Sequence, residues 1–258
     1  MKKSSPSFFL MLGFFTRIPV PKSDFSEERF GKSMILLPLV GLVIGLVLAL
    51  IQFFLGWIGN GVSPWISAAV LTGAYIFITG GLHFDGLADT CDGVLSGRTR
   101  EQSLEIMKDS RIGVFGTLGL LMTCLLYFAL FIEIPPYMLL IFPAIGRACC
   151  LVSASMAPYA REDGMGKSTS KQSGVASVIS AIITIVGVSV GISILITIPV
   201  LVQSLISAGV AVLVTVLLTL KFKKKLGGVT GDTFGAIIEA SSLVYIFVFL
   251  IFWRAFPY

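Results

Sequence analysis

GVASVISAIITIVGVSVGISILITIPVLVQSLISAGVAVLVTVLLTL, residues 174–220, runs without a single Asp, Glu, Lys or Arg. A helix needs about 20 apolar residues to cross the hydrocarbon core of a bilayer, so this stretch is long enough for two crossings. Pro199 has no backbone N–H to donate, and we expect it to mark the turn between them. The stretch therefore predicts two consecutive membrane helices, at 174–198 and 199–220.

The composition of the whole chain agrees with a membrane protein. Hydrophobic residues make up 55% of the 258 residues and charged residues 13%, against about 25% charged residues in soluble globular chains. A soluble domain of this size has too much exterior to hide so much apolar surface, and a disordered chain would be rich in charge. We interpret the net charge of +5 as a signal of membrane orientation and not of nucleic-acid binding.

Five further apolar stretches bring the expected number of transmembrane helices to about seven: 33–58, 64–82, 112–132, 136–157 and 230–252. We therefore expect an all-α polytopic membrane protein whose single domain covers residues 1–258. Every Lys and Arg other than Arg147 and Arg254 falls in segments that this topology places on one side. Because cytoplasmic loops are the ones enriched in basic residues, we predict that the N-terminal interfacial segment 1–32 and the loop 83–111 are cytoplasmic.

An acidic segment, GGLHFDGLADTCDGVLSGRTREQSLEIMKDSRIG (80–113), contains the only histidine of the chain. Asp85, Asp89 and Asp92 have the spacing i, i+4, i+7, which places them on one stripe of a helix. Like charges at this spacing repel each other, so the acids either take up protons or are held together by a cation. All-oxygen ligation suits a hard cation such as Mg²⁺. The alternative is a solvated acidic face on a cytoplasmic loop.

Two glycines and a set of charges support a functional site in this segment. Gly86 and Gly93 each follow an aspartate, and glycine inside a helix is costly unless another backbone must approach closely. Downstream, the spacing of Glu101, Glu105 and Asp109 predicts a second helix that ends near Gly113. Cations beside an acidic cluster are expected to bind the phosphates of a charged substrate. Here the cations are Lys108 and Arg111. Alternatively, these two residues are ordinary basic residues that flank the third span.

A second polar site is expected in LGGVTGDTFGAIIEA (226–240). Asp232 lies at a helix start, where the helix dipole favours an acid, and capping is its alternative role. Glu239 lies two turns further into the membrane, where an unpaired acid is costly, so we expect a partner such as Arg147 or the metal. His83 falls opposite the acids on the same ideal helix, and is either a structural hydrogen-bonding residue or a ligand or acid–base group.

Five motifs resemble the cobalamin synthase family, whose activity is that of adenosylcobinamide-GDP ribazoletransferase. They are FFTRIPVP (14–21), GGLHFDGLADTCDG (80–93), EIMKDSRIG (105–113), the loop from Arg161 to Gly166 and GGVTGDTFGA (227–236). The resemblance implies a Mg²⁺-dependent reaction at the bacterial inner membrane. In that reaction α-ribazole, or its 5′-phosphate, attacks adenosylcobinamide-GDP and expels GMP.

The residues and the resemblance together assign three roles. Catalytic candidates are Asp85, Asp89 and Asp109, and metal-ligand candidates are the same three acids and Asp92. Candidates for binding substrate or phosphate are Lys108, Arg111, Arg17, His83, Asp232 and Glu239. The expected partners are the two substrates and the lipid bilayer, without nucleic acid, and the oligomeric state is left open.

Three alternatives remain from the sequence. A weaker likeness to the CDP-alcohol phosphotransferases, carried by Asp85, Gly86 and Ala88, leaves a lipid-head-group enzyme as the alternative enzyme. A transporter could use the intramembrane Glu239 and Arg147, although the acids concentrate in one cytoplasmic segment. A scaffold for a biosynthetic complex would tolerate loss of the whole acidic stripe.

Overall fold

The computed structural model describes residues 7–58, 61–162 and 174–256. Within these ranges the chain is helical, and its one pairing of extended backbone is an isolated bridge between Tyr159 and Val229. The helices, in chain order, are α1 (Phe8–Phe15), α2 (Glu27–Ser33), the 3-10 turn η1 (Met34–Leu36), α3 (Leu37–Trp57), α4 (Pro64–Thr79), α5 (Leu82–Leu95), α6 (Arg100–Ile106), α7 (Val114–Glu133), α8 (Pro136–Met156), α10 (Val175–Leu195), α11 (Ile198–Leu226) and α12 (Gly231–Ala255).

The predicted fold class is confirmed. Six helical runs of the described chain are long and apolar enough to cross a membrane: α2 to α3, α7, α8, α10, α11 and α12. A seventh is obtained if α4 and α5 are counted as one bent span. The turn between α10 and α11 lies at Ile196 and Thr197, so Pro199 belongs to the first turn of α11 and not to the connection. A proline is tolerated there because the first turn of a helix needs no backbone donor.

The helix α8 forms the centre of the bundle. It packs against α3, α10, α11 and α12, and it is the most deeply buried of the six long runs. Gly45 of α3 allows this close packing, because a Cβ there would overlap the backbone of Leu140 in α8. In a bilayer, where the lipid is as apolar as the side chains, such small residues let helices associate by close backbone contact.

The expected second span ends in a sharp bend. Gly80 and Gly81 both have positive φ, at 62° and 71°, a conformation that glycine adopts without the steric cost that a Cβ brings. The axes of α4 and α5 therefore differ by 88°. As a result α5, which carries the acidic stripe, leaves the line of α4 and packs against α7 and α12.

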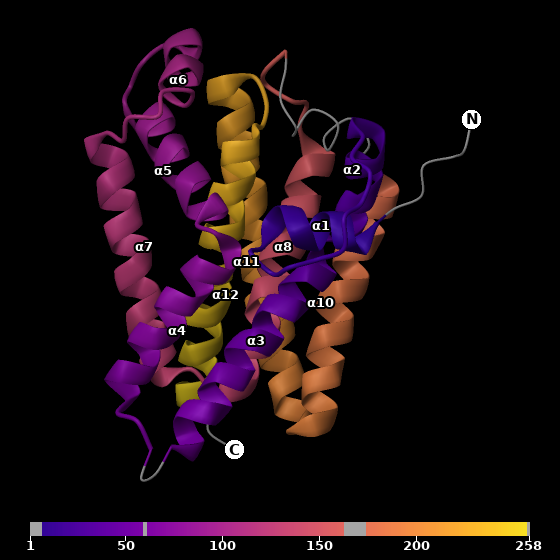
Figure 1. The fold of residues 1–258 in the computed structure, drawn as a ribbon, viewed down its shortest axis with the longest axis vertical. Coiled ribbons are helices and arrows are strands. Elements are labelled where there is room, and N and C mark those ends of the chain that lie inside the picture. The colour runs from indigo at the N-terminus through magenta and orange to yellow at the C-terminus, as the bar shows by residue number, and fades with distance from the viewer. Residues whose placement is uncertain (1–6, 59–60, 163–173, 257–258) are drawn as a thin grey trace.

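The segments rich in Lys and Arg gather at one end of the bundle. Figure 1 shows α2, α6 and the turn from α11 to α12 at this end, with the last residues of α3 and α12 at the other. At the far end Arg254 forms an ion pair with Glu133 at 2.5 Å. The arrangement agrees with the charge asymmetry of the sequence, and we refer to the first of these ends as the basic end.

Candidate functional site

The site is built where α5 crosses α12. A Cβ at Gly86 would lie 2.8 Å from the carbonyl oxygen of Asp232, and one at Gly235 would lie 2.9 Å from the carbonyl oxygen of His83. Both distances are too short for a side chain, so the two glycines let the helix backbones touch. The expectation that Gly86 serves a close backbone approach is confirmed, and the approaching backbone is that of the second polar motif.

Extended backbone after α8 brings an arginine to this crossing. The backbone N–H of Ala160 donates to the carbonyl of Val229 at 2.8 Å, and that of Val229 donates to Pro158 at 2.9 Å. This short pairing fixes Arg161, which donates to a carboxylate oxygen of Asp232 at 2.7 Å. Both side chains of the pair are mostly buried, at 14% and 22% exposure, so solvent screens their attraction only in part.

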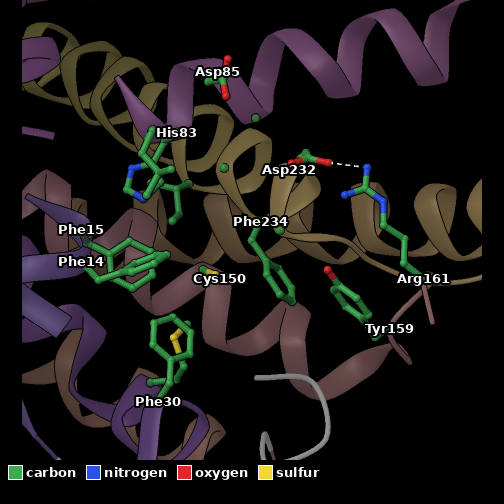
Figure 2. Close-up of a pocket in the computed structure, with 16 residues that line it drawn as sticks. Phe14, Phe15, Phe30, His83, Asp85, Cys150, Tyr159, Arg161, Asp232 and Phe234 are labelled. Carbon is green, nitrogen blue, oxygen red and sulfur yellow. Dashed lines mark hydrogen bonds and ion pairs between the residues drawn. The ribbon is translucent and has the colours of Figure 1, made fainter. Parts of the chain in front are cut away.

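A cavity of about 310 Å³ opens beside this ion pair, and Figure 2 shows the side chains around it. Its mouth is polar, with Asp85, Asp232, Arg161 and Tyr159, and the rest of its wall is mainly apolar and aromatic. A concave apolar pocket with a few convergent polar groups is the usual form of a small-molecule site. The cavity is therefore the candidate binding site, and its polar mouth is the candidate reaction site.

The three acids of the predicted stripe do share a helix, α5, but their surroundings differ. Asp85 is exposed at the mouth of the cavity, Asp89 is half-buried and Asp92 is buried. Asp232 and Asp85 are both close enough to Asp89 for their charges to repel its carboxylate. The structure thus groups Asp85 and Asp89 with the second polar motif, Asp232, across the crossing of the two helices.

Asp92 faces a different helix. Its two carboxylate oxygens accept hydrogen bonds from the backbone N–H groups of Gly113, at 2.7 Å, and Gly116, at 2.9 Å. These donors belong to the start of α7, which has no other side-chain cap. The carboxylate therefore satisfies helix donors that would otherwise be unpaired.

The residues 107–113 form a turn and not the end of a helix. The predicted helix through Asp109 is wrong in this respect, because α6 ends at Ile106 and the next helix is capped at Gly113. The exposed Arg111 holds Asp109 through hydrogen bonds of 2.6 to 3.1 Å and lowers the pKa of its carboxyl to about 2. Lys108 is exposed beside them, and none of the three lines the cavity.

Glu239 is fully buried beneath the cavity and is satisfied by tyrosines. It accepts hydrogen bonds from Tyr127 at 2.7 Å and Tyr75 at 3.1 Å, and its oxygen lies 3.5 Å from Nδ1 of His83. The partner expected from the sequence, Arg147, instead donates to the carbonyl of Pro143 at 2.9 Å. His83 is buried on the side of α5 away from the exposed Asp85, as the helical spacing predicted, and it lines the cavity.

Arg17 lies at the bend between α4 and α5. Its backbone N–H donates to the carbonyl of Ile78 at 2.7 Å, and its side chain covers Gly80, where a Cβ would collide with Nε. Arg17 is exposed and is not among the residues that line the cavity. The structure therefore places it as a contact of the bend that positions α5.

The donor chemistry of the mouth fits a hard cation. Asp85, Asp89 and Asp232 supply only carboxylate oxygens, the ligand type that Mg²⁺ prefers. In the described part of the chain, no three His, Cys, Asp or Glu side chains already stand together as a metal centre. The fit thus rests on the type of the donors and not on a metal centre that is already formed.

Two contributions to the site are not predicted from the sequence. In the sequence, Arg161 is only the first residue of a loop motif, whose end beyond Glu162 lies outside the described residues. The phenylalanines of the cavity wall, Phe14, Phe15, Phe30 and Phe234, look like any other apolar residues of a membrane protein. The one available signal was that Phe14 and Phe15 begin the N-terminal motif FFTRIPVP.

Comparisons with known proteins agree over almost the entire chain. Residues 7–250 match the family described as cobalamin-5-phosphate synthase. Three relatives are named adenosylcobinamide-GDP ribazoletransferase. The one from Alkaliphilus oremlandii is 41% identical over 93% of this chain and 94% of its own. The one from Fusobacterium nucleatum is 38% identical over 95% and 96%. The one from Escherichia coli is 34% identical over 95% and 100%. No solved structure matches the chain.

Proposed function

The chain belongs to the cobalamin-5-phosphate synthase family, and from this premise we propose how its α5–α12 crossing carries out the family's reaction. The chain transfers ribazole to adenosylcobinamide-GDP in the assembly of the cobalamin nucleotide loop. Neither a lipid-head-group enzyme nor a transporter is favoured by these relatives. The observation that carries the proposed site is the Arg161–Asp232 pair, which lines the mouth of a cavity together with Asp85 and has Asp89 nearby.

The reaction makes and breaks one bond at phosphorus. A hydroxyl of α-ribazole, or of its 5′-phosphate, attacks the phosphorus next to the cobinamide, and the bond to GMP breaks. Mg²⁺, when held by Asp85, Asp89 and Asp232, would supply positive charge to the phosphate oxygens. Arg161 lies beside these acids and can bind the same oxygens through its planar guanidinium.

The chain's own acids can also accept the proton. Asp85 is exposed at the mouth and Asp89 is half-buried next to it, so either carboxylate can take the proton of the attacking hydroxyl. Lys108 and Arg111 lie in the exposed turn after α6, where they can attract the negatively charged substrate before it binds. Asp109, held by Arg111, orients that guanidinium.

The proposed orientation follows from the basic end. The site lies toward the end of the bundle where Lys and Arg gather, and such an end normally faces the cytoplasm. We therefore place the site at the cytoplasmic face of a bacterial inner membrane, where soluble nucleotides are available. Labelling of single cysteines introduced at Lys108 and at Arg254 in intact cells tests this, since only the second is expected to react with an impermeant reagent.

The activity is tested with purified protein in detergent. The assay measures release of GMP from adenosylcobinamide-GDP after addition of α-ribazole, with Mg²⁺ or with excess EDTA. We expect turnover only with the metal, and a loss of about 100-fold or more in the variants Asp85→Asn and Asp89→Asn. The matched control is Asp24→Asn, an exposed acid of the N-terminal segment. Full activity of both site variants would overturn the assignment of the acids, and turnover in EDTA would overturn the role of Mg²⁺.

A further inference from the structure

The wall of the cavity is lined by aromatic rings from three parts of the chain. Phe14 and Phe15 belong to α1, Phe30 to α2 and Phe234 to α12. The rings of Phe14 and Phe30 lie 4.9 Å apart, and the ring of His83 continues the wall 5.8 Å from Phe15. Figure 2 shows Phe14, Phe15 and Phe30 on one side of the view, Asp232, Arg161 and Tyr159 on the other, and Phe234 between them.

The short helices α1 and α2 complete this wall. Their buried residues, Met11, Phe15 and Phe30, join the core of the bundle, so the two helices are fixed to it. Ser7 and Ser33 tie them together, because the backbone N–H of Ser7 donates to the hydroxyl of Ser33 at 2.8 Å. The N-terminal segment therefore has a definite place beside the site.

We propose that this aromatic cavity binds the base of the ribazole substrate, so that the ribose projects toward Asp85, Asp89 and Arg161. The inference rests on the proposed function for the identity of the ligand. The base of ribazole is a flat, largely apolar bicyclic ring, and such rings stack on aromatic side chains. A base seated against the phenylalanines would bring the ribose hydroxyls to the acids at the mouth.

The size and chemistry of the cavity argue against the other flat groups of the reaction. About 310 Å³ accommodates a nucleoside, whereas a corrin ring is several times larger. Guanine carries hydrogen-bonding groups on most of its edge, and burying these without partners costs free energy. Away from the polar residues of the mouth, the lining consists of glycines, of Phe, Met, Leu, Ile and Cys side chains and of His83, so this part of the cavity suits a base with few polar atoms.

The test measures binding of each substrate separately. Phe234→Leu removes a ring of the wall and keeps an apolar side chain of similar size. Its matched control is Phe249→Leu, a fully buried phenylalanine of the same helix that does not line the cavity. Phe14→Leu, at a half-buried position of the wall, is the second variant in case Phe234→Leu does not fold. Dissociation constants for α-ribazole and for GMP are measured by equilibrium dialysis in detergent.

We expect both wall variants to weaken α-ribazole binding by about tenfold, in line with the loss of one stacking contact, and to leave GMP binding unchanged. In steady-state assays the KM for α-ribazole should rise with little change in kcat or in the KM for adenosylcobinamide-GDP. Unchanged α-ribazole affinity in the wall variants, or an equal loss in Phe249→Leu, would overturn the proposal. Weaker GMP binding instead would assign the cavity to guanine.

The binding experiment also separates this inference from the proposed function. Failure of the wild-type protein to release GMP would count against the reaction, while the dissociation constant of α-ribazole would still report on the cavity. Normal turnover of the wild-type protein, together with unchanged α-ribazole affinity in the wall variants, would support the reaction and contradict the base-binding role of the cavity.

Discussion

Asp92 accepts a hydrogen bond from the backbone N–H of Gly116 at 2.9 Å, and this contact fastens the acidic helix α5 to the first turn of α7. The neighbouring Asp89 is instead half-buried and close enough to Asp232 and Asp85 to interact with their charges. Asp89 and Asp92, which are three residues apart, therefore have different roles. Asp92 caps a helix, and Asp89 lies near Asp85 and Asp232, which line the polar mouth of the cavity.

The first prediction uses this difference. Asp92→Ala should lower the free energy of unfolding by about 1–2 kcal/mol, because it leaves two helix donors without their acceptor. Asp89→Asn should leave stability unchanged or raise it, since it removes repulsion between like charges, yet it should abolish GMP release. Thermal unfolding in detergent and the release assay, applied to both variants, measure the two effects. Greater destabilisation by Asp89→Asn than by Asp92→Ala would contradict this division.

The second prediction concerns the ion pair at the mouth. Arg161→Ala should lower kcat/KM by about tenfold or more, because the phosphates lose a charged hydrogen-bond donor and Asp232 loses its partner. The control is Arg254→Ala, which breaks an exposed pair with Glu133 at the opposite end of the bundle. An exposed pair contributes less than about 1 kcal/mol, so this control should keep full activity. Equal activity of the two variants would refute a role for Arg161 in the reaction.

Helix positions and the acidic stripe were predictable because they depend on local patterns. The apolar runs are long enough to specify spans by themselves, and the spacing of Asp85, Asp89 and Asp92 follows directly from helix geometry. The bend at Gly80 and Gly81 was not predicted, since adjacent glycines permit positive φ without requiring it. It nevertheless decides that α5 meets α12.

The partners of each charge were harder to predict, because they depend on which helices pack together. A buried acid at Glu239 requires partners, but the sequence offered Arg147, whereas the bundle places Tyr75 and Tyr127 against it. The role of Asp92 was hidden for the same reason, since its donors are backbone groups of α7. A sequence does not show which backbone N–H groups an acid will contact, so only the structure distinguishes the role of Asp92 from the roles of Asp85 and Asp89.

The third prediction concerns the buried cluster around Glu239. Tyr127→Phe should lower the free energy of unfolding by about 1–3 kcal/mol, because a buried carboxylate loses one of its two hydroxyl donors. In a Glu239→Leu background the same change should cost much less, since the hydrogen bond is already absent. A double-mutant cycle of thermal stability measures this coupling. Additive effects of the two substitutions would show that the hydroxyl and the carboxylate do not stabilise each other.

The fourth prediction tests the contact on which the whole site depends. Gly86→Ala places a Cβ 2.8 Å from the backbone oxygen of Asp232, and neither helix backbone can move aside easily. We expect a loss of about 1–3 kcal/mol in stability and a marked fall in GMP release, because α12 must shift away from the acids of α5.

Gly187→Ala, in α10, is the matched control. Its Cβ would meet nothing within 4 Å, and alanine favours a helix by up to about 1 kcal/mol over glycine. This control should therefore be as stable as the wild type or more so, with full activity. If Gly86→Ala behaves like Gly187→Ala, the close approach of α5 and α12 is not what holds the two halves of the site together.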